Sequence, residues 1–221
     1  MSIIESLRTA LKKRTIIADG AMGTMIQAAD PSLEDFEGLE GCNEILNVSR
    51  PDIIKEVHRK YLSVGCDAIE TNTFGANFAN LAEYGIPDRI YELAYAGGKI
   101  AKEVTEEFSE KKWVLGSIGP GTKLPTLGHI EFEQLRQTYF QCAKGLVDAG
   151  VDGLLIETAQ DLLQAKAAVI AAREAIDKSE RDVVLIVQVT VETTGTMLLG
   201  SEIGAALNAL SALGIDVIGM N

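Results

Sequence analysis

The chain has 221 residues, a formal net charge of −12 and 47% hydrophobic residues. A globular domain usually holds about 100–200 residues, so this length fits one large domain or two small ones. The apolar content is enough for a sizeable core and argues against disorder. The acidic balance counts against nucleic acid as a partner, because binding phosphates requires a basic face.

The chain shows no targeting or membrane signal. Residues 1–14 mix charged and apolar side chains and lack the apolar centre of a signal peptide. No apolar run approaches the roughly 20 residues of a membrane span, so we expect no membrane partner. The three cysteines, Cys42, Cys66 and Cys142, are odd in number and far apart. That spacing is no disulfide framework, and it predicts a reducing compartment, the cytoplasm.

Short apolar runs alternate with amphipathic stretches along the whole chain. The runs, rich in Ile, Val and Leu at consecutive positions, are 15–18, 67–71, 113–118, 152–157, 183–189 and 215–220. Consecutive apolar residues predict strands buried on both faces of a parallel sheet. The helical stretches between them include 53–64, 89–107, 132–149 and 162–175. This alternation indicates an α/β fold built from βαβ units.

One short pattern recurs at three helix-to-strand junctions, residues 64–69, 149–154 and 213–218. Each has a glycine suited to ending a helix and, two residues later, an aspartate at the entry of the next strand. The repetition suggests stacked copies of one βα unit, which a barrel uses more uniformly than an open sheet. An open doubly wound sheet remains the alternative, because sequence does not give the strand order.

Two helix starts have the Ser/Thr-x-x-Asp form of a capping box. In Ser49-Arg50-Pro51-Asp52 and Thr158-Ala159-Gln160-Asp161 we expect the hydroxyl to cap a free N–H group.

The carboxyl ends of the predicted strands are acidic and hydroxylic. Ligands of parallel α/β folds bind at this edge, which carries Asp19, Glu70, Glu157 and Glu192 but no lysine, arginine or histidine. The missing lysine weakens a Schiff-base aldolase, and Gly20-x-x-Gly23 lacks the third glycine of a dinucleotide fingerprint. Paired acids suit an α-amino group, and glycine-rich turns offer N–H groups to a carboxylate. An amino acid is therefore a reasonable substrate, although these acids could equally cap turns or bind neighbouring backbone.

The cysteines and histidines do not form a recognisable metal motif. Zinc needs three or four converging ligands, and the three cysteines show no such spacing, so we expect them to be free and buried. His58 lies among charged residues and is expected on the solvated surface of its helix. His129 follows a turn and is expected to be structural or exposed.

Two motifs at the first strand ends resemble those of the homocysteine S-methyltransferase family: Asp19-Gly20-Ala21-Met22-Gly23-Thr24 and Glu70-Thr71-Asn72-Thr73-Phe74-Gly75. Residues 43–61 resemble its cobalamin-dependent methionine synthase branch. Gly119-Pro120, Ile156-Glu157-Thr158 and Gly219-Met220-Asn221 are similar too. The motifs follow the family's order from about Thr15 to the last residue.

The resemblance implies a (βα)8 TIM barrel, present here as a single domain over 1–221 that carries an incomplete barrel through about strand six. It implies that homocysteine is activated on zinc and methylated by methylcobalamin to give methionine, with cobalamin-binding and methyltetrahydrofolate-binding modules as partners. By position, Asp19 and Glu157 would hold the amino group of homocysteine. The other substrate-binding positions would be Gly20, Ala21, Thr71, Asn72, Thr73 and Asn221.

The chain departs from the family pattern at the metal. The three zinc cysteines of the family have no counterpart at Cys42, Cys66 or Cys142, and they are expected beyond Asn221. We therefore assign no catalytic or metal-binding residue and expect the isolated chain to be inactive. Open barrel edges would favour self-association. Two alternatives remain: a cobalamin-independent enzyme with a betaine-like or sulfonium methyl donor, and a non-catalytic, amino-acid-binding pseudo-enzyme barrel.

Overall fold

The computed structural model describes residues 5–221, and its centre is a five-stranded parallel sheet. The strands lie side by side in chain order: β1 (Ala68–Glu70), β2 (Trp113–Ile118), β3 (Gly153–Ala159), β4 (Val184–Val189) and β5 (Val217–Met220). A doubly wound sheet reverses its strand order at a switch point, and this sheet has no reversal. The sheet is therefore an arc of consecutive barrel strands, which does not close among the described residues.

The predicted first strand, 15–18, is reduced to a single parallel bridge between Ala18 and Ala68. Ile17 is 61% exposed, and its N–H donates to the Asp67 carboxylate at 2.9 Å, whereas its carbonyl accepts the Ala68 N–H at 3.2 Å. A side chain thus replaces part of the backbone ladder. The expectation of six full strands was wrong at this position.

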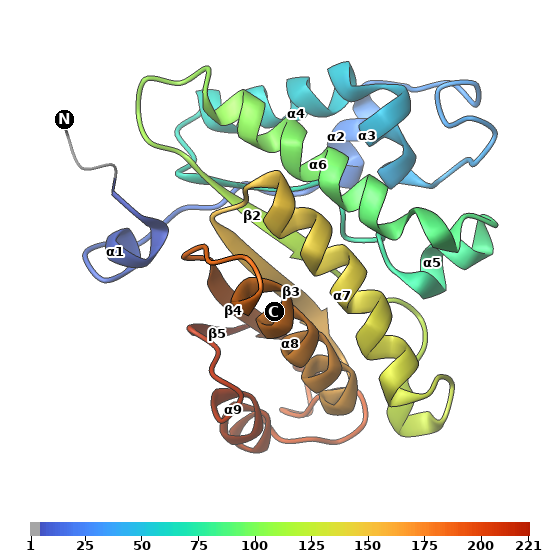
Figure 1. Cartoon of the computed structure of the whole chain (residues 1–221), viewed down its shortest axis with the longest axis vertical. Coiled ribbons are helices and arrows are strands. Elements are labelled where there is room, and N and C mark those ends of the chain that lie inside the picture. Colours follow the sequence, from blue (N-terminus) through green and yellow to red (C-terminus); the bar gives the residue numbers. More distant parts are fainter. Residues whose placement is uncertain (1–4) are drawn as a thin grey trace.

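The helices lie along the outer face of the sheet (Figure 1), where α6, α7 and α8 pack side by side. The long ones are α4 (Pro51–Ser63), α6 (Ile90–Thr105), α7 (Phe132–Ala149) and α8 (Leu162–Asp177), close to the predicted bounds. The shorter helices are α1 (Leu7–Leu11), α2 (Met22–Ala28), α3 (Leu46–Ser49), α5 (Phe78–Glu83) and α9 (Ile203–Ser211), with 3-10 turns η1 (Asn43–Ile45), η2 (Pro87–Arg89) and η3 (Pro125–Leu127). Within residues 5–221, none of the helices combines the length and apolar character that a bilayer crossing requires.

Most of the core lies between the sheet and these helices, and includes Leu146, Leu154 and Ile100. All six residues of β2 are buried, which accounts for a sequence that is apolar except at Ser117. A second, smaller cluster closes the amino end of the sheet, where Leu7 and Ala10 of α1 pack with Trp113 and Leu155. The amino-terminal helix therefore covers the end of the sheet opposite the strand carboxyl ends.

The junction aspartates share one structural role. Each follows a glycine with positive φ and accepts a hydrogen bond from the backbone N–H of the neighbouring strand segment, at 2.8–2.9 Å. The three aspartate–N–H pairs are Asp67–Ile17, Asp152–Val114 and Asp216–Leu185. Each carboxylate also pairs with a cationic side chain, from Arg14, Lys102 and Arg8 respectively. These contacts fix the relative register of adjacent strands at their entry.

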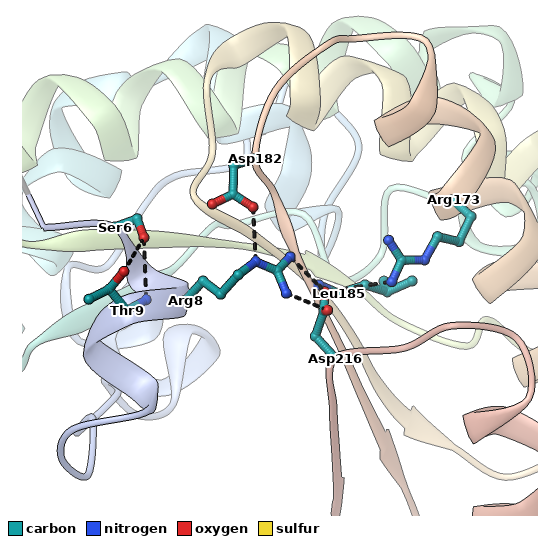
Figure 2. A network of polar contacts seen from close by, with 7 residues as sticks. All are labelled: Ser6, Arg8, Thr9, Arg173, Asp182, Leu185 and Asp216. Atoms are coloured by element: carbon teal, nitrogen blue, oxygen red, sulfur yellow. Dashed lines mark hydrogen bonds and ion pairs between the residues drawn. The ribbon is translucent and has the colours of Figure 1, made fainter.

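Figure 2 shows the junction at Asp216, which ties α1 to the last strand. The Arg8 guanidinium donates to both Asp216 oxygens, at 2.5 and 3.1 Å, and to Asp182 at 2.9 Å. Arg173 approaches Asp216 from α8 at 3.6 Å. Two elements 208 positions apart in the chain are joined in this way.

Both predicted capping hydroxyls were wrong. Ser49 donates its hydroxyl proton to the Ile45 carbonyl within α3, at 3.1 Å, and makes no cap on α4. Thr158 lies inside β3, and the cap of α8 is Asp161, which accepts the Leu163 N–H at 2.8 Å. The helix begins at Leu162, as predicted, so the residue at its N-cap position is Asp161 and not Thr158.

His58 is also a correction, because its side chain is 0% exposed. It shares the inner face of α4 with Ile54 and Leu62, four residues to either side. The charged neighbours in sequence point to the outer face. Burial lowers the pKa of His58 to about 4, so the imidazole is neutral at physiological pH.

Replacing Asp67 by alanine is expected to lower the free energy of unfolding by about 1–3 kcal/mol, because the Ile17 N–H and Arg14 lose their charged acceptor. The matched substitution Asp88→Ala, at an exposed position in η2, is expected to change it by less than about 0.5 kcal/mol. Urea denaturation of both variants measures the difference. Equal losses would contradict the role given to the junction aspartates.

Candidate functional site

A cavity of about 440 Å³ opens at the carboxyl ends of the first strands. Its wall consists of the turn at 20–23, residues 43–44, the segment that follows β1, and one residue each from β2 and β3, Ser117 and Glu157. Three acidic side chains line it, Glu44, Glu70 and Glu157, and no lysine, arginine or histidine does. Within the described chain, the cavity wall is therefore suited to a cationic group.

Asp19 lies behind this wall with one carboxylate oxygen engaged and one free. Its Oδ1 accepts the Glu70 N–H at 3.0 Å, whereas its Oδ2 is buried and has no partner among the described residues. Burial raises the pKa of Asp19, and together with a smaller contribution from the nearby Glu157 it brings that pKa to about 7. A buried carboxyl oxygen without a donor is costly, so Asp19 has an unused capacity to bind a donor.

Glu70 and Glu157 face the cavity from the ends of β1 and β3. Burial raises the pKa of Glu70 to about 8, with added repulsion from Glu157 and Asp19. Burial also raises the pKa of Glu157, although the Ser117 hydroxyl, which donates to its Oε1 at 2.5 Å, works in the other direction. Asp19, Glu70 and Glu157 repel one another when they are ionised, and a bound cation would relieve that repulsion.

Thr71 and Asn72 line the cavity, but Thr73 does not. Thr73 is 0% exposed and donates its hydroxyl proton to the Ser117 carbonyl at 2.7 Å. The Thr71 hydroxyl accepts the Ser117 N–H at 3.0 Å. The two threonines therefore extend the β1–β2 ladder beyond the end of β1, and they hold Ser117 in place to meet Glu157.

Buried amides support the cavity floor. The Asn72 side-chain amide donates to the Asn43 carbonyl at 2.7 Å and to Asn47 Oδ1 at 3.0 Å. Asn47 in turn donates to the Asn72 and Leu93 carbonyls. This exchange joins the segment before α4 to the segment after β1.

Glu44 and Ser117 are cavity residues that sequence reasoning missed. Glu44 accepts the Gly75 N–H at 2.7 Å, and a Cβ at Gly75 would lie 2.6 Å from its carboxylate. Burial raises the pKa of Glu44. No periodicity marks Glu44, which lies in a 3-10 turn. Ser117 could have been found, because it is the only polar side chain in the strand 113–118 and the neighbouring strand carries Glu157.

Asn221 and Glu192 lie away from the cavity wall. Asn221 contacts Thr158 and Thr190, and Glu192 is exposed in the loop after β4. Gly20 and Ala21 line the wall, and the Tyr61 hydroxyl donates to the Ala21 carbonyl at 3.0 Å. Of the predicted substrate residues, the cavity wall thus contains Gly20, Ala21, Thr71, Asn72 and Glu157. Asp19 lies behind the wall, and Thr73 and Asn221 are also outside it.

The residues present do not fit a zinc site. Cys42, Cys66 and Cys142 are free and buried, and residues 5–221 contain no group of three His, Cys, Asp or Glu side chains placed to hold a metal ion. Burial raises the pKa of Cys42 to about 11 and of Cys142 to about 12, which keeps both thiols protonated. His129 Nδ1 instead accepts the Leu124 N–H at 3.4 Å within its own loop.

Comparison with known proteins gives a consistent result. A family profile described as homocysteine S-methyltransferase matches residues 16–221. Methionine synthase of Mycobacterium tuberculosis is 55% identical over 218 residues, and that of Mycobacterium leprae is 54% identical. Each alignment covers 97% of this chain, which spans only 18% of the length of either relative.

Among solved structures, the apo form of the homocysteine methyltransferase MmuM from Escherichia coli has a TM-score of 0.72 at 21% identity. That alignment covers 97% of this chain and 75% of MmuM. The metallated form has a TM-score of 0.61 at 18% identity, covering 95% and 92%. At these identities the likeness shows the fold, and it agrees with the parallel α/β arrangement described above.

Because the pKa values of Asp19 and Glu70 are raised in the folded state, we expect the protein to become less stable as the pH rises. Asp19 and Glu70 have folded-state pKa values of about 7 and about 8, whereas an unfolded chain has them near 4. The folded state holds more protons between these values, so the stabilisation is full at low pH and is lost as the pH rises through 7 and 8.

Urea denaturation between about pH 6.5 and 8.5 measures this loss. The titration of unfolded His58 near pH 6.5 is common to the wild type and the variants, so it cancels in their comparison. Glu70→Gln is expected to reduce it by an amount on the order of 1 kcal/mol. Glu192→Gln, an exposed glutamate at the same edge of the sheet, should leave it unchanged. Identical pH profiles for the wild type and Glu70→Gln would show that Glu70 is ionised throughout.

Proposed function

Because the chain belongs to the homocysteine S-methyltransferase family, we propose that its cavity binds homocysteine as the amino-acid half of a methionine-forming enzyme. The observation that carries the proposal is a cavity with Glu157 in its wall, Asp19 close behind the wall and no cationic side chain in the wall. The identity to methionine synthases supports this type of enzyme over one that uses a betaine-like or sulfonium donor.

In the proposed complex, the homocysteine ammonium group lies between the two acids. The partnerless Oδ2 of Asp19 and the carboxylate of Glu157 accept its N–H bonds. Charge-assisted bonds of this kind are stronger than neutral ones, and they would draw both acids into the ionised form. Glu70 adds negative charge on the same side. The homocysteine carboxylate then faces the backbone of the turn at Gly20 and Ala21, while Thr71 and Asn72 form the wall beside it.

The thiol chemistry is not assigned to any residue of this chain. A homocysteine thiol has a pKa near 8.5, so it is mostly protonated at neutral pH, and residues 5–221 offer no fitting zinc site to stabilise the thiolate. We propose that zinc and methylcobalamin are held by other parts of a larger enzyme, which also has a methyltetrahydrofolate-binding module. The length of the relatives supports this division.

Residues 1–221 form one domain in this proposal. Its exposed apolar edge, made by Ile203 and Leu207 of α9 and Met220 of β5, is the surface through which the isolated chain would self-associate. The free cysteines favour a reducing compartment, so we place the protein in the cytoplasm.

Isothermal titration with L-homocysteine tests the proposed site. Glu157→Gln and Asp19→Asn are each expected to weaken binding about 10- to 100-fold, because a hydrogen bond between charged groups is lost. Glu192→Gln is the matched control and should bind as the wild type does.

The ligand 4-mercaptobutanoate, which lacks the amino group, should bind weakly to the wild type and equally to Glu157→Gln. If Glu157→Gln binds homocysteine with unchanged affinity, the amino-group assignment is wrong.

The isolated chain, supplied with homocysteine and methylcobalamin, is expected to form no methionine, because the described residues hold no zinc site that would stabilise the thiolate. Product analysis by mass spectrometry measures this. Methionine formation that persists after treatment with a metal chelator would contradict the proposal that zinc held by another part of the enzyme is required.

A further inference from the structure

The backbone of Thr158 is strained, and it lies directly beside Glu157. Among residues 5–221, four non-glycine residues have positive φ, and three of them, Asp30, Glu37 and Glu180, are exposed and outside the strands. Thr158, at φ 57°, is half-buried, β-branched and inside β3. A left-handed conformation costs about 1–2 kcal/mol for such a residue, so the surrounding structure must enforce it.

The strain at Thr158 coincides with a bulge in β3, which begins directly after Ile156. The β3–β4 ladder is in register up to Ile156 and Val187, and it resumes at Ala159 and Val189. Two residues of β3, Glu157 and Thr158, therefore stand opposite the single residue Gln188. A bulge of this kind bends the strand and turns a side chain away from the regular alternation. Here Glu157 keeps the face that Leu155 occupies two residues earlier, and it reaches Ser117 and the cavity. The alternation shifts after Glu157, since Ala159 joins the same core cluster as Ile156.

Asn221 holds the bulge from the neighbouring strand ends. Its side-chain amide donates to the Thr158 hydroxyl oxygen at 3.1 Å, and its Oδ1 accepts from the Thr190 hydroxyl at 3.3 Å. Its own backbone is fixed on both sides of the end of β4: its N–H donates to the Val189 carbonyl at 3.1 Å, and its carbonyl accepts the Val191 N–H at 3.0 Å. The amide thus links the ends of β3, β4 and β5.

We propose that Asn221 and Thr158 are positioning residues, which hold Glu157 toward the cavity without touching the ligand. Asn221 is absent from the cavity wall, and the path from its amide to the cavity runs through Thr158 and then Glu157. The choice of homocysteine as the probe rests on the function proposed above.

A double-mutant cycle with L-homocysteine tests the proposal by isothermal titration. Asn221→Ala and Thr158→Val each remove the hydrogen bond to the bulge, and each is expected to weaken binding about three- to tenfold. In a Glu157→Gln background, neither should cause a further loss. Thr158→Ser keeps the hydroxyl and should restore binding. Thr194→Val, which removes an exposed hydroxyl from the loop after β4, is the matched control.

Additive losses in the Glu157→Gln background would overturn the proposal, because Asn221 would then act on the ligand directly. Wild-type affinity in Asn221→Ala would overturn it as well.

A second measurement needs no ligand and separates this inference from the proposed function. The side-chain carboxyl of Glu157 can be titrated by carbon-13 NMR in the wild type, Asn221→Ala, Thr158→Val and Thr194→Val. Loss of the amide link should displace the Glu157 titration midpoint from its wild-type position, and Thr194→Val should not. If the wild type fails to bind homocysteine, the proposed function is wrong and this titration still decides the positioning role. An unchanged midpoint in Asn221→Ala would refute it.

Discussion

The register between neighbouring parallel strands decides where every polar side chain of the cavity lies. The junction aspartates contribute to that register at the entry of the strands. Each one accepts a backbone N–H near the start of the neighbouring strand segment and also pairs with a cationic side chain. Because the parallel strands begin in register, their carboxyl ends lie together at one edge of the sheet. Asp19, Glu70 and Glu157, which lie 138 positions apart at their extremes, then come together because each follows or ends its own strand.

This gathering of acids has an electrostatic consequence. With no cationic side chain in the cavity wall, the three carboxyls repel one another and burial disfavours their ionised forms. The fold tolerates the arrangement by leaving part of the group protonated near neutral pH. An α-ammonium group would supply the missing counter-charge, so the feature that limits stability is the one that would provide affinity. Stability and ligand binding are therefore coupled through the same side chains.

The sequence predicted the long strands and helices well, because the pattern of apolar residues in each of them is regular. The strand 113–118 and the helix 132–149 match β2 and α7 at both ends, since each is a continuous apolar run or a long amphipathic stretch. The prediction was weaker where side chains replace backbone contacts. Residues 15–18 form only one bridge to β1, with the Ile17 N–H bound to the Asp67 carboxylate, and Ser49 and Thr158 turn their hydroxyls to other partners.

The site itself was predicted in part. The predicted strand ends identified Asp19, Glu70 and Glu157 from the sequence. Periodicity carries no sign of a bulge, so the strained backbone of Thr158 and the contacts of Asn221 needed the structure. His58 was misplaced because its charged neighbours hid its position on the inner face of α4.

A crystal structure of the chain with L-homocysteine bound tests the central claim most directly. The account predicts the amino nitrogen within hydrogen-bond distance, about 2.7–3.2 Å, of both the Asp19 and the Glu157 carboxylates. An amino group placed elsewhere in the cavity, with Asp19 Oδ2 still without a partner, would contradict it.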